Sequence, residues 1–457
     1  MATDLAEVMR KIVGEKGVFT DAKSIAVFSR DAFYFSPVLK AQLENKRADL
    51  IVAPRSVVEL QKVVSYAARE GIPVMVRGAG TGNYGQSVPF YGGIVISTHR
   101  LNRILDFDEA SGVIRVEPGV RMGHVERFAR ERGWELRCYP STWATATIGG
   151  FVGGGFGGVG SIRNGVLWDG FLKSITVLEV TEEAKTHTVE GHDVFGFIHA
   201  YGTTGIMVEL EVSLVPAVPW EEAVICFPDY ADALRFSHQL ALDESEAKRL
   251  ISLSEWPIPS FFRPLVAAGG IIEGQAAVLL ELAEGRTATV AEKAAPYGGK
   301  LTYTAPASTY HKGKFCLSDF SWNHTTLWAM KADPGWTYLQ SRFTPEPEKA
   351  LEQISALRDF HGDKVAFHHE YIRQDGELEL AGLDLIHYQE KEPIYAAIAR
   401  REELGVQVAD PHTFLLDADP RWSGEVVLAA RARYNPHNLL NPGKISSQPL
   451  TEKARSW

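Results

Sequence analysis

Apolar residues recur with two different periods along the first half of the chain. Between residues 56 and 68 they follow the 3.6-residue period of a helix, and Ser56 with Glu59 predicts a capping box at its start. Short alternating runs predict hairpins over residues 103–117 and 174–189 and a strand over 206–215. Residues 122–132 are predicted to form an amphipathic helix. Such a mixture of short strands and helices is typical of an α+β fold.

The pattern breaks at Pro216–Pro219, which favours a domain boundary there. Further along, aromatic residues concentrate between positions 303 and 343. They are Tyr303, Tyr310, Phe315, Phe320, Trp322, Trp328, Trp336, Tyr338 and Phe343. Such a cluster either packs a sheet against helices or forms the walls of a site for a flat or apolar molecule.

Two segments dense in glycine carry the clearest functional signal. The first glycine segment is residues 77–87, RGAGTGNYGQS, and the second is residues 147–161, TIGGFVGGGFGGVGS. A backbone without Cβ atoms can curl around a phosphate and point several N–H groups at it. Two such segments predict ordered loops around a ligand with two phosphates.

The first glycine segment also contains the weaker dinucleotide-binding pattern GxGxxG, at Gly80–Gly85. A Rossmann unit needs a helix that begins inside these glycines. Here residues 86–93 contain a proline and a turn and lead into a second apolar run at 94–96. Asp106, at the distance of a ribose-binding acid, alternates with apolar residues as on a strand. Strand, loop, strand is therefore predicted, and an NAD site is disfavoured.

The order of several motifs resembles that of the FAD-linked oxidases of the vanillyl-alcohol oxidase type, and among them the glycolate oxidase and D-lactate dehydrogenase branch. The matching positions are Arg77–Gly82, Pro140 with Ser141, Ala146–Gly150, Gly202–Ile206 and Asn441–Lys444. The resemblance implies a two-subdomain PCMH-type FAD-binding domain with an inserted α+β cap domain that covers the flavin and selects the substrate. The implied divisions are residues 1–218 for the FAD-binding domain (core 45–218), 219–424 for the cap and 425–457 for a C-terminal return to the FAD-binding domain.

Together, the resemblance and the glycine segments assign a set of residues to FAD. The set is Arg77, Gly78, Ala79, Gly80, Thr81, Gly82, Asn83, Gln86, Ser87, Pro140, Ser141, Thr147, Gly149, Gly150, Gly153, Gly154, Gly157, Ser161, Gly165, Gly205, Ile206, Asn441 and Lys444. Relatives that bind FAD covalently carry a histidine where this chain has Thr81, and some add a cysteine near Thr145. We therefore expect FAD to be bound without a covalent bond.

Members of this branch often hold a divalent metal through the motif HxGDGNxH. Residues 361–368 preserve only the spacing of its two histidines, so we expect no catalytic metal. The alternative is a metal held by His368, His369 and Glu370, although neighbouring residues of a strand point to opposite faces.

Oxidation of a carbon that bears a hydroxyl needs a base for the O–H proton, and histidine has a suitable pKa. A carboxylate or phenolate substrate also needs a cation, which arginine supplies as a planar fork. The candidate catalytic residues are His324, Arg342, His369 and His412.

Composition narrows the class of protein further. A chain of 457 residues with 45% hydrophobic content can form two or three domains. Its net charge of −10 is spread without long runs of one sign, so nucleic-acid binding is not expected. It has no signal-peptide pattern, no stretch approaching the length of a membrane span, and three cysteines far apart in the sequence. These features predict a soluble cytoplasmic protein without disulfides.

The combined prediction is an FAD-dependent oxidoreductase acting on CH–OH donors. It transfers a hydride to flavin N5 from a small molecule, either a 2-hydroxy acid or an aromatic alcohol or phenol. The alternatives on the same fold are an electron-relay flavoprotein subunit and a reductase of a nucleotide-sugar enol ether. The substrate, the electron acceptor (dioxygen, a quinone or a redox protein) and the oligomeric state, with a homodimer among the options, are left open.

Overall fold

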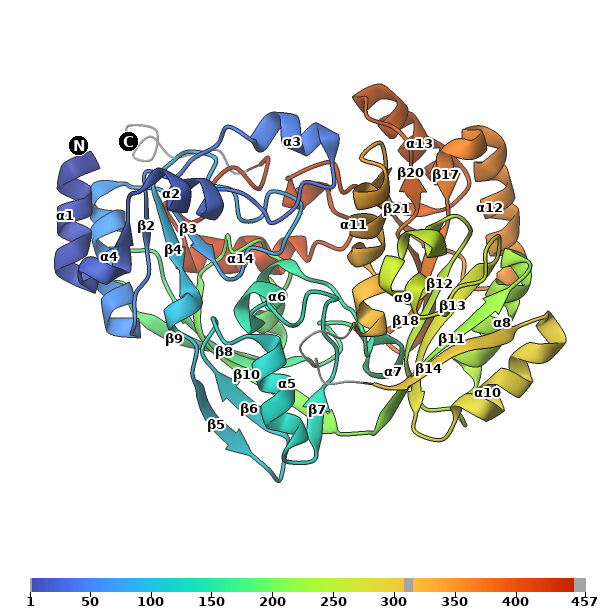
Figure 1. Ribbon diagram of the computed structural model, residues 1–457. Helices are drawn as coiled ribbons and strands as arrows, with labels where there is room; N and C mark the ends of the chain where they lie inside the picture. The colour runs from blue at the N-terminus through green and yellow to red at the C-terminus, as the bar shows by residue number, and fades with distance from the viewer. Residues whose placement is uncertain (1, 308–314, 448–457) are drawn as a thin grey trace.

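The computed structural model describes residues 2–307 and 315–447. Figure 1 shows the described chain as an N-terminal region around β2–β4, a middle region around β5–β10 and a cap region that begins at β11. Tyr310, one of the clustered aromatics, lies outside the described residues. The mixture of helices and strands confirms the predicted α+β class.

The N-terminal region contains a small sheet covered by helices. Its strands, in spatial order, are β1 (Val18–Phe19), β2 (Leu50–Val52), β4 (Ile94–Ser97) and β3 (Val74–Arg77), and its helices are α1 (Ala2–Val13), α2 (Ala22–Phe28), α3 (Pro37–Leu43) and α4 (Val57–Glu70). β3 and β4 are parallel, with Val74 opposite Ile94. The first glycine segment lies in the connection between them, and residues 78–93, all of which are described, contain no helix. The predicted order of strand, loop, strand is confirmed.

Helix α4 begins where the sequence predicts. The Ser56 hydroxyl accepts a hydrogen bond from the Glu59 N–H at 3.2 Å, as an N-cap does. The Glu59 carboxylate accepts from the Arg55 N–H at 2.7 Å instead of from Ser56, so the second half of the capping box is displaced by one residue. The helix ends at Gly71, whose left-handed φ of +72° is typical of a C-cap glycine.

The middle region is built on a second, antiparallel sheet. Its strands are β5 (Ile104–Asp108), β6 (Val113–Val116), β10 (Ile206–Pro216), β8 (Leu172–Leu178) and β9 (Thr186–Glu190) in spatial order, with β7 (Trp134–Leu136) beside β10. β5 pairs with β6 and β8 pairs with β9, as the two predicted hairpins require. Helix α5 (Met122–Arg130) ends two residues before its predicted limit.

The second glycine segment differs from its prediction as a loop. Residues Ile148–Gly154 form helix α6, and Ser161–Asn164 form the short helix α7. The Thr147 hydroxyl begins α6 by accepting a hydrogen bond from the Gly150 N–H at 3.2 Å. Glycine disfavours helices, but the buried side chains of Phe151 and Val152 anchor this one in the core. Tertiary packing therefore overrides the propensity of the segment.

The cap region, on the right in Figure 1, is built on an eight-stranded sheet. Its strands in spatial order are β14 (Lys300–Pro306), β11 (Trp220–Phe227), β13 (Ala276–Ala283), β12 (Lys248–Ser254), β18 (His368–Gln374), β19 (Glu377–Gly382), β16 (Gln340–Phe343) and β21 (Gln407–Ala409). A small sheet of β15 (Thr337–Tyr338), β20 (Leu385–Ile386) and β17 (Val365–Ala366) lies apart from it. The helices are α8 (Tyr230–Leu242), α9 (Arg263–Ala267), α10 (Thr287–Ala294), α11 (Asn323–Ala332), α12 (Pro347–His361) and α13 (Lys391–Glu403).

The chain then leaves the cap region through α14 (Gly424–Tyr434), which runs back beside the middle region in Figure 1. The Tyr434 carbonyl accepts from the Val180 N–H at 2.6 Å, and the Val74 carbonyl accepts from the Asn441 N–H at 2.7 Å. The C-terminal residues therefore contact β3 of the first sheet and the segment that follows β8 of the second. The domain boundaries at 218 and 424 stay predictions. In the described part of the chain, no helix combines the length and the apolar character that crossing a membrane requires.

Candidate functional site

A cavity of about 620 Å³ separates the cap region from the two regions before it. One side, the glycine wall, is formed by residues between 32 and 207, chiefly the two glycine segments. The other side, the cap wall, is formed by residues between 322 and 421. The volume lies within the usual range of ligand and cofactor sites.

The two glycine segments meet at one end of the glycine wall. A Cβ atom at Gly78 would lie 2.2 Å from the Thr147 hydroxyl oxygen, so no side chain fits between the segments. Gly80 has a left-handed φ of +70°, and a Cβ there would lie 2.0 Å from the Arg77 guanidinium. Gly78 therefore has to be glycine because of the close approach to Thr147. Gly80 has to be glycine because of its close contact with Arg77 and because of its positive φ.

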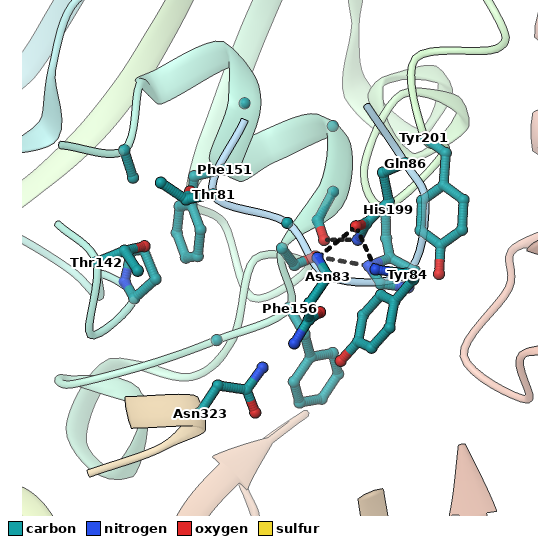
Figure 2. A pocket seen from close by; sticks show the side chains of 18 of the residues that line it. Thr81, Asn83, Tyr84, Gln86, Thr142, Phe151, Phe156, His199, Tyr201 and Asn323 are labelled. Carbon is teal, nitrogen blue, oxygen red and sulfur yellow. Dashed lines mark hydrogen bonds between the residues drawn. The ribbon is translucent and has the colours of Figure 1, made fainter. Parts of the chain in front are cut away.

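Gln86 ties the two segments together. Its Oε1 accepts from the N–H groups of Asn83, at 3.1 Å, and Tyr84, at 3.0 Å. Its Nε2 donates to the Gly154 carbonyl in α6 at 3.2 Å, and Figure 2 shows this side chain between the two backbones. One amide thus fixes the spacing of the segments that the sequence predicts to hold the phosphates.

The glycine wall has few ionisable side chains. Between residues 32 and 207, all of which are described, the cavity is lined by no Asp, Glu, Lys or Arg. Glycine and threonine are its most frequent residues, so backbone dipoles and hydroxyl groups face the cavity. A wall of this kind can approach a pyrophosphate without a carboxylate to repel it, and the residues present therefore fit FAD.

Most of the predicted cofactor residues line this cavity. They are Gly78, Ala79, Gly80, Thr81, Gly82, Asn83, Gln86, Ser87, Pro140, Ser141, Thr147, Gly149, Gly150, Gly153, Gly154, Gly157, Gly205 and Ile206. The other five, which do not line it, are Arg77, Ser161, Gly165, Asn441 and Lys444.

Asn441 and Lys444 support the first glycine segment and its neighbours from behind. The Asn441 amide donates to the carbonyls of Gln86, at 3.0 Å, and Tyr201, at 2.6 Å. The Lys444 ammonium donates to the carbonyl of Val88 at 3.0 Å. Both side chains are buried and hold the backbone in shape without reaching the cavity.

The remaining three predicted residues also have structural contacts or positions away from the cavity. The Arg77 guanidinium donates to the Arg30 carbonyl at 2.6 Å, and the Ser161 hydroxyl accepts from the Gly158 N–H at 3.0 Å. Gly165 ends α7 with a φ of +79°. The structure therefore gives these residues supporting positions, one step away from the cavity surface.

On the cap wall, Arg342 of β16 is a cation facing the cavity. Its Nε lies 3.1 Å from Oε2 of Glu379, and one of its NH₂ groups donates to the Gln374 side-chain oxygen at 3.0 Å. Burial raises the pKa of Glu379, and Arg342 opposes this shift. The Arg342 side chain is 35% exposed, so part of the guanidinium is accessible to a ligand.

His324, in the first turn of α11, also lines the cavity. Burial lowers the pKa of its imidazole, and the charge of Asp319 opposes this only in part. The ring is therefore neutral near pH 7 and can accept a proton. Of the four predicted catalytic residues, His324 and Arg342 are the two that the fold brings to one cavity.

His369 and His412 do not line the cavity, so the fold does not bring them together with His324 and Arg342. His369 Nδ1 bonds to the Tyr230 hydroxyl, while Ile372 and Gln374 of the same strand face the cavity, so strand alternation turns His369 away. His412 Nδ1 lies 2.8 Å from the Ser36 hydroxyl, and its Nε2 is also bonded to protein. Burial lowers the pKa of His412 to about 4.

The aromatic cluster in the cap supplies less of the lining than expected. Of its described members only Trp322 lines the cavity. Phe320 instead packs in the core against Phe262, with ring centroids 5.2 Å apart, and Trp328 donates its indole N–H to the Asp319 carbonyl. These residues belong to the packing alternative that the sequence left open.

The sequence did not point to the group around Arg421. Arg421 donates to the Asp419 carboxylate, with Nε 2.8 Å from Oδ1, and Asp419 Oδ2 lies 3.2 Å from His199 Nε2. Burial alone would raise the pKa of Asp419, but Arg421 lowers it overall. Arg421, His199 and Tyr201 line the cavity, and Figure 2 shows the last two beside Tyr84. His199 and Tyr201 directly precede the Gly202–Ile206 motif, a signal that could have found them.

In the described part of the chain, no group of three or more His, Cys, Asp and Glu side chains is arranged to hold a metal. His361 Nε2 lies 3.0 Å from the Arg401 guanidinium, and His368 Nδ1 lies 2.9 Å from the Ser254 hydroxyl. Both histidines are therefore engaged by protein groups.

Comparison with known proteins agrees with this geometry. Residues 48–186 match the FAD binding domain family. Glycolate oxidase subunit GlcD of Bacillus subtilis (strain 168) is 26% identical over 436 residues, which cover 89% of this chain and 90% of that protein. D-2-hydroxyglutarate dehydrogenase of Stutzerimonas stutzeri (strain A1501) is 29% identical over 46% of this chain and 45% of that protein. For D-lactate dehydrogenase of Anaerostipes hadrus the identity is 29%, over 43% of each chain.

The fold has solved counterparts as well. An alkyldihydroxyacetonephosphate synthase structure superimposes with a TM-score of 0.72 at 14% identity, covering 97% of this chain and 85% of that one. The chain thus carries a PCMH-type FAD-binding domain. It is an FAD-dependent oxidoreductase, related to GlcD along most of its length.

Proposed function

We propose that the chain oxidises a 2-hydroxy acid to the corresponding 2-oxo acid. The observation that carries the proposal is the composition of one cavity, in which a glycine wall without Asp, Glu, Lys or Arg faces a neutral histidine, His324, and an arginine, Arg342. Three of the relatives, a glycolate oxidase subunit, a D-lactate dehydrogenase and a D-2-hydroxyglutarate dehydrogenase, are named for 2-hydroxy acids. When bound along the glycine wall, FAD supplies the hydride acceptor at its N5 atom.

Arg342 is the proposed carboxylate-binding residue. Its guanidinium already holds Glu379 and Gln374 on one side, so its orientation is fixed before substrate arrives. A planar fork of N–H donors suits a carboxylate better than a flexible ammonium does. Arg421 is the less suitable cation, because its side chain is only 16% exposed, against 35% for Arg342.

His324 is the proposed general base. As the C2–H bond breaks and its electron pair leaves as hydride, the C2–O bond becomes a carbonyl and the hydroxyl proton moves to the imidazole. Burial keeps this ring neutral, because it lowers the pKa of His324. Aromatic alcohols are the weaker proposal, since Trp322 alone of the described aromatic cluster lines the cavity. An electron-relay subunit would need neither the base nor the cation.

We also propose that FAD is bound without a covalent bond. Thr81 and Thr145 line the cavity at the positions where covalent relatives carry a nucleophile, and the described lining contains no cysteine. Acid precipitation of the holoenzyme should release all the yellow colour into the supernatant. A coloured pellet would contradict the proposal. The electron acceptor is left open, and the cytoplasmic location and the option of a homodimer stay predictions from the sequence.

An anaerobic panel of glycolate, both lactate enantiomers, 2-hydroxyglutarate and benzyl alcohol tests the function. We expect at least one 2-hydroxy acid to bleach the flavin absorption, and admission of air then shows whether dioxygen reoxidises the flavin rapidly. Bleaching by benzyl alcohol alone, or by no compound of the panel, would overturn the assignment to 2-hydroxy acids.

A further inference from the structure

Trp322 occupies an unusual backbone conformation in the cap wall. Its φ is +52° and its ψ is −141°, at the residue directly before α11. A bulky L-residue with positive φ is rare, because its Cβ crowds the backbone. Such conformations persist only where the surroundings hold them, and they concentrate at functional sites.

A buried carboxylate holds Trp322 in this conformation. Glu370 of β18 accepts from the Trp322 N–H at 2.7 Å and is itself only 1% exposed. Its Oε1 also lies 3.2 Å from His368 Nε2, while His368 Nδ1 meets the Ser254 hydroxyl of β12 at 2.9 Å. Two strands of the cap sheet therefore hold the Trp322 backbone, and with it an indole that lines the cavity.

The indole N–H of Trp322 has no hydrogen-bond partner among the described residues, although the atom is buried. Gln340 of β16 is in a similar position, since its Nε2 donates to the Tyr84 hydroxyl but its Oε1 is buried and unpaired within the same part of the chain. Turning the amide over would only exchange which of its atoms is unpaired. Both residues line the cavity.

Unpaired buried polar groups are costly, and a bound ligand that pairs with them recovers the cost. The indole N–H can only donate, whereas the free end of the Gln340 amide accepts through its oxygen or, with the amide turned over, donates through its nitrogen. An alcohol hydroxyl fits both orientations, because it accepts from the indole N–H and either donates to the amide oxygen or accepts from the amide nitrogen.

Arg342 lies two residues beyond Gln340 on the same strand, so both side chains stand on one face of the cap sheet. We propose that Trp322 and Gln340 form a hydroxyl-binding subsite beside the carboxylate-binding Arg342. The substrate is then a 2-hydroxy acid that carries at least one further hydroxyl group along its carbon chain. This inference rests on the proposed function for the role of the acid group, and it adds the class of substrate.

Binding to the oxidised holoenzyme tests the subsite without turnover. Butyrate is compared with 3-hydroxybutyrate, 4-hydroxybutyrate and 3,4-dihydroxybutyrate by isothermal titration calorimetry, because none of these acids has a hydroxyl at C2. We expect at least one hydroxylated acid to bind about tenfold more tightly than butyrate. Trp322→Phe removes the N–H but keeps an aromatic ring, and it should abolish most of this preference.

Trp328→Phe is the matched control. Trp328 lies in the same helix, α11, but donates its N–H to the Asp319 carbonyl and does not line the cavity. The control should keep the preference for the hydroxylated acid. If Trp322→Phe does not fold with FAD, Gln340→Met tests the same subsite by the same titration and should also reduce the preference.

Two results would overturn the inference. They are equal binding of all four acids by the wild-type enzyme and an unchanged preference in Trp322→Phe. A shifted flavin spectrum together with the unchanged preference would assign the indole N–H to the flavin. Failure of the proposed function is seen separately, because it is the absence of anaerobic flavin bleaching by 2-hydroxy acids.

Discussion

The two walls of the cavity are built in opposite ways. The glycine wall uses mainly backbone from two short segments, and its conformation depends on Gly78 and Gly80, where no side chain fits. The cap wall uses side chains from α11, β16, β18 and β19, which antiparallel pairing brings together. The glycine wall therefore suits the part of a ligand that is the same in many enzymes, such as the pyrophosphate of a cofactor. The cap wall suits a substrate, which differs between enzymes.

This difference predicts how substitutions in each wall should affect cofactor binding and catalysis. A substitution in the glycine wall alters backbone geometry and should act on cofactor binding as a whole. A substitution in the cap wall removes one polar group and should act on one step, such as proton transfer or substrate affinity.

Gly80→Val should have the largest effect. The substitution places a β-branched residue at φ +70° and a Cβ atom 2.0 Å from the Arg77 guanidinium. We expect a folded but largely colourless protein, measured as the ratio of flavin to protein absorbance. Its stability should fall by about 4 kcal/mol if FAD is present at about a thousand times its dissociation constant.

Gly274→Val provides the control for backbone strain. Gly274 also has a positive φ, of +78°, but no atom lies within 4 Å of its added Cβ, and it does not line the cavity. This variant should keep full flavin occupancy. Full occupancy in Gly80→Val as well would refute the phosphate-binding role of the first glycine segment.

His324→Gln should lower kcat by about 10²- to 10⁴-fold, the usual contribution of a general base. FAD content should not change, because His324 belongs to the cap wall. Burial lowers the pKa of His324, so the wild-type rate should decline only below the ordinary histidine range as the ring becomes protonated. The variant should lose this decline. A kcat near the wild-type value would remove His324 as the base.

Arg342→Met should lower kcat/KM for a 2-hydroxy acid by about 100-fold, mainly through KM, because a carboxylate loses its cation. The variant also leaves Glu379 without its partner, so Arg342→Met with Glu379→Gln separates the two effects. The double variant should stay impaired. Recovery would mean that Arg342 only neutralises Glu379. Arg373→Met, on β18 and outside the cavity lining, is the control.

Much of the glycine wall could be predicted from the sequence, because its residues are consecutive and their function depends on a missing side chain. The strands around the first glycine segment and the hairpins β5–β6 and β8–β9 were also predictable from local patterns. Helix α6 was not, because its many glycines disfavour a helix and only the buried contacts of Phe151 and Val152 offset this.

The cap wall could be predicted only in part. His324 and Arg342 were candidates by residue type, but nothing in their spacing connects them to Gln374 or Glu379, since long-range strand pairing does that. Residue type alone equally favoured His369 and His412, which the fold encloses. The sequence predicts which side chains are able to do chemistry, and the sheet topology decides which of them meet.

The smallest expected effect is that of His412→Gln, which tests whether an enclosed histidine of the cap acts only on stability. Burial lowers the pKa of His412 to about 4 in the folded protein, against about 6.5 when unfolded. Between these values the unfolded chain binds a proton that the folded one does not, so stability falls as pH drops below about 6.5. Urea unfolding at pH 7 and pH 5 with saturating FAD should therefore show a loss about 2 kcal/mol smaller in His412→Gln than in the wild type. Exposed His124→Gln should behave as the wild type, and a large loss of kcat in His412→Gln would instead give His412 a part in the chemistry.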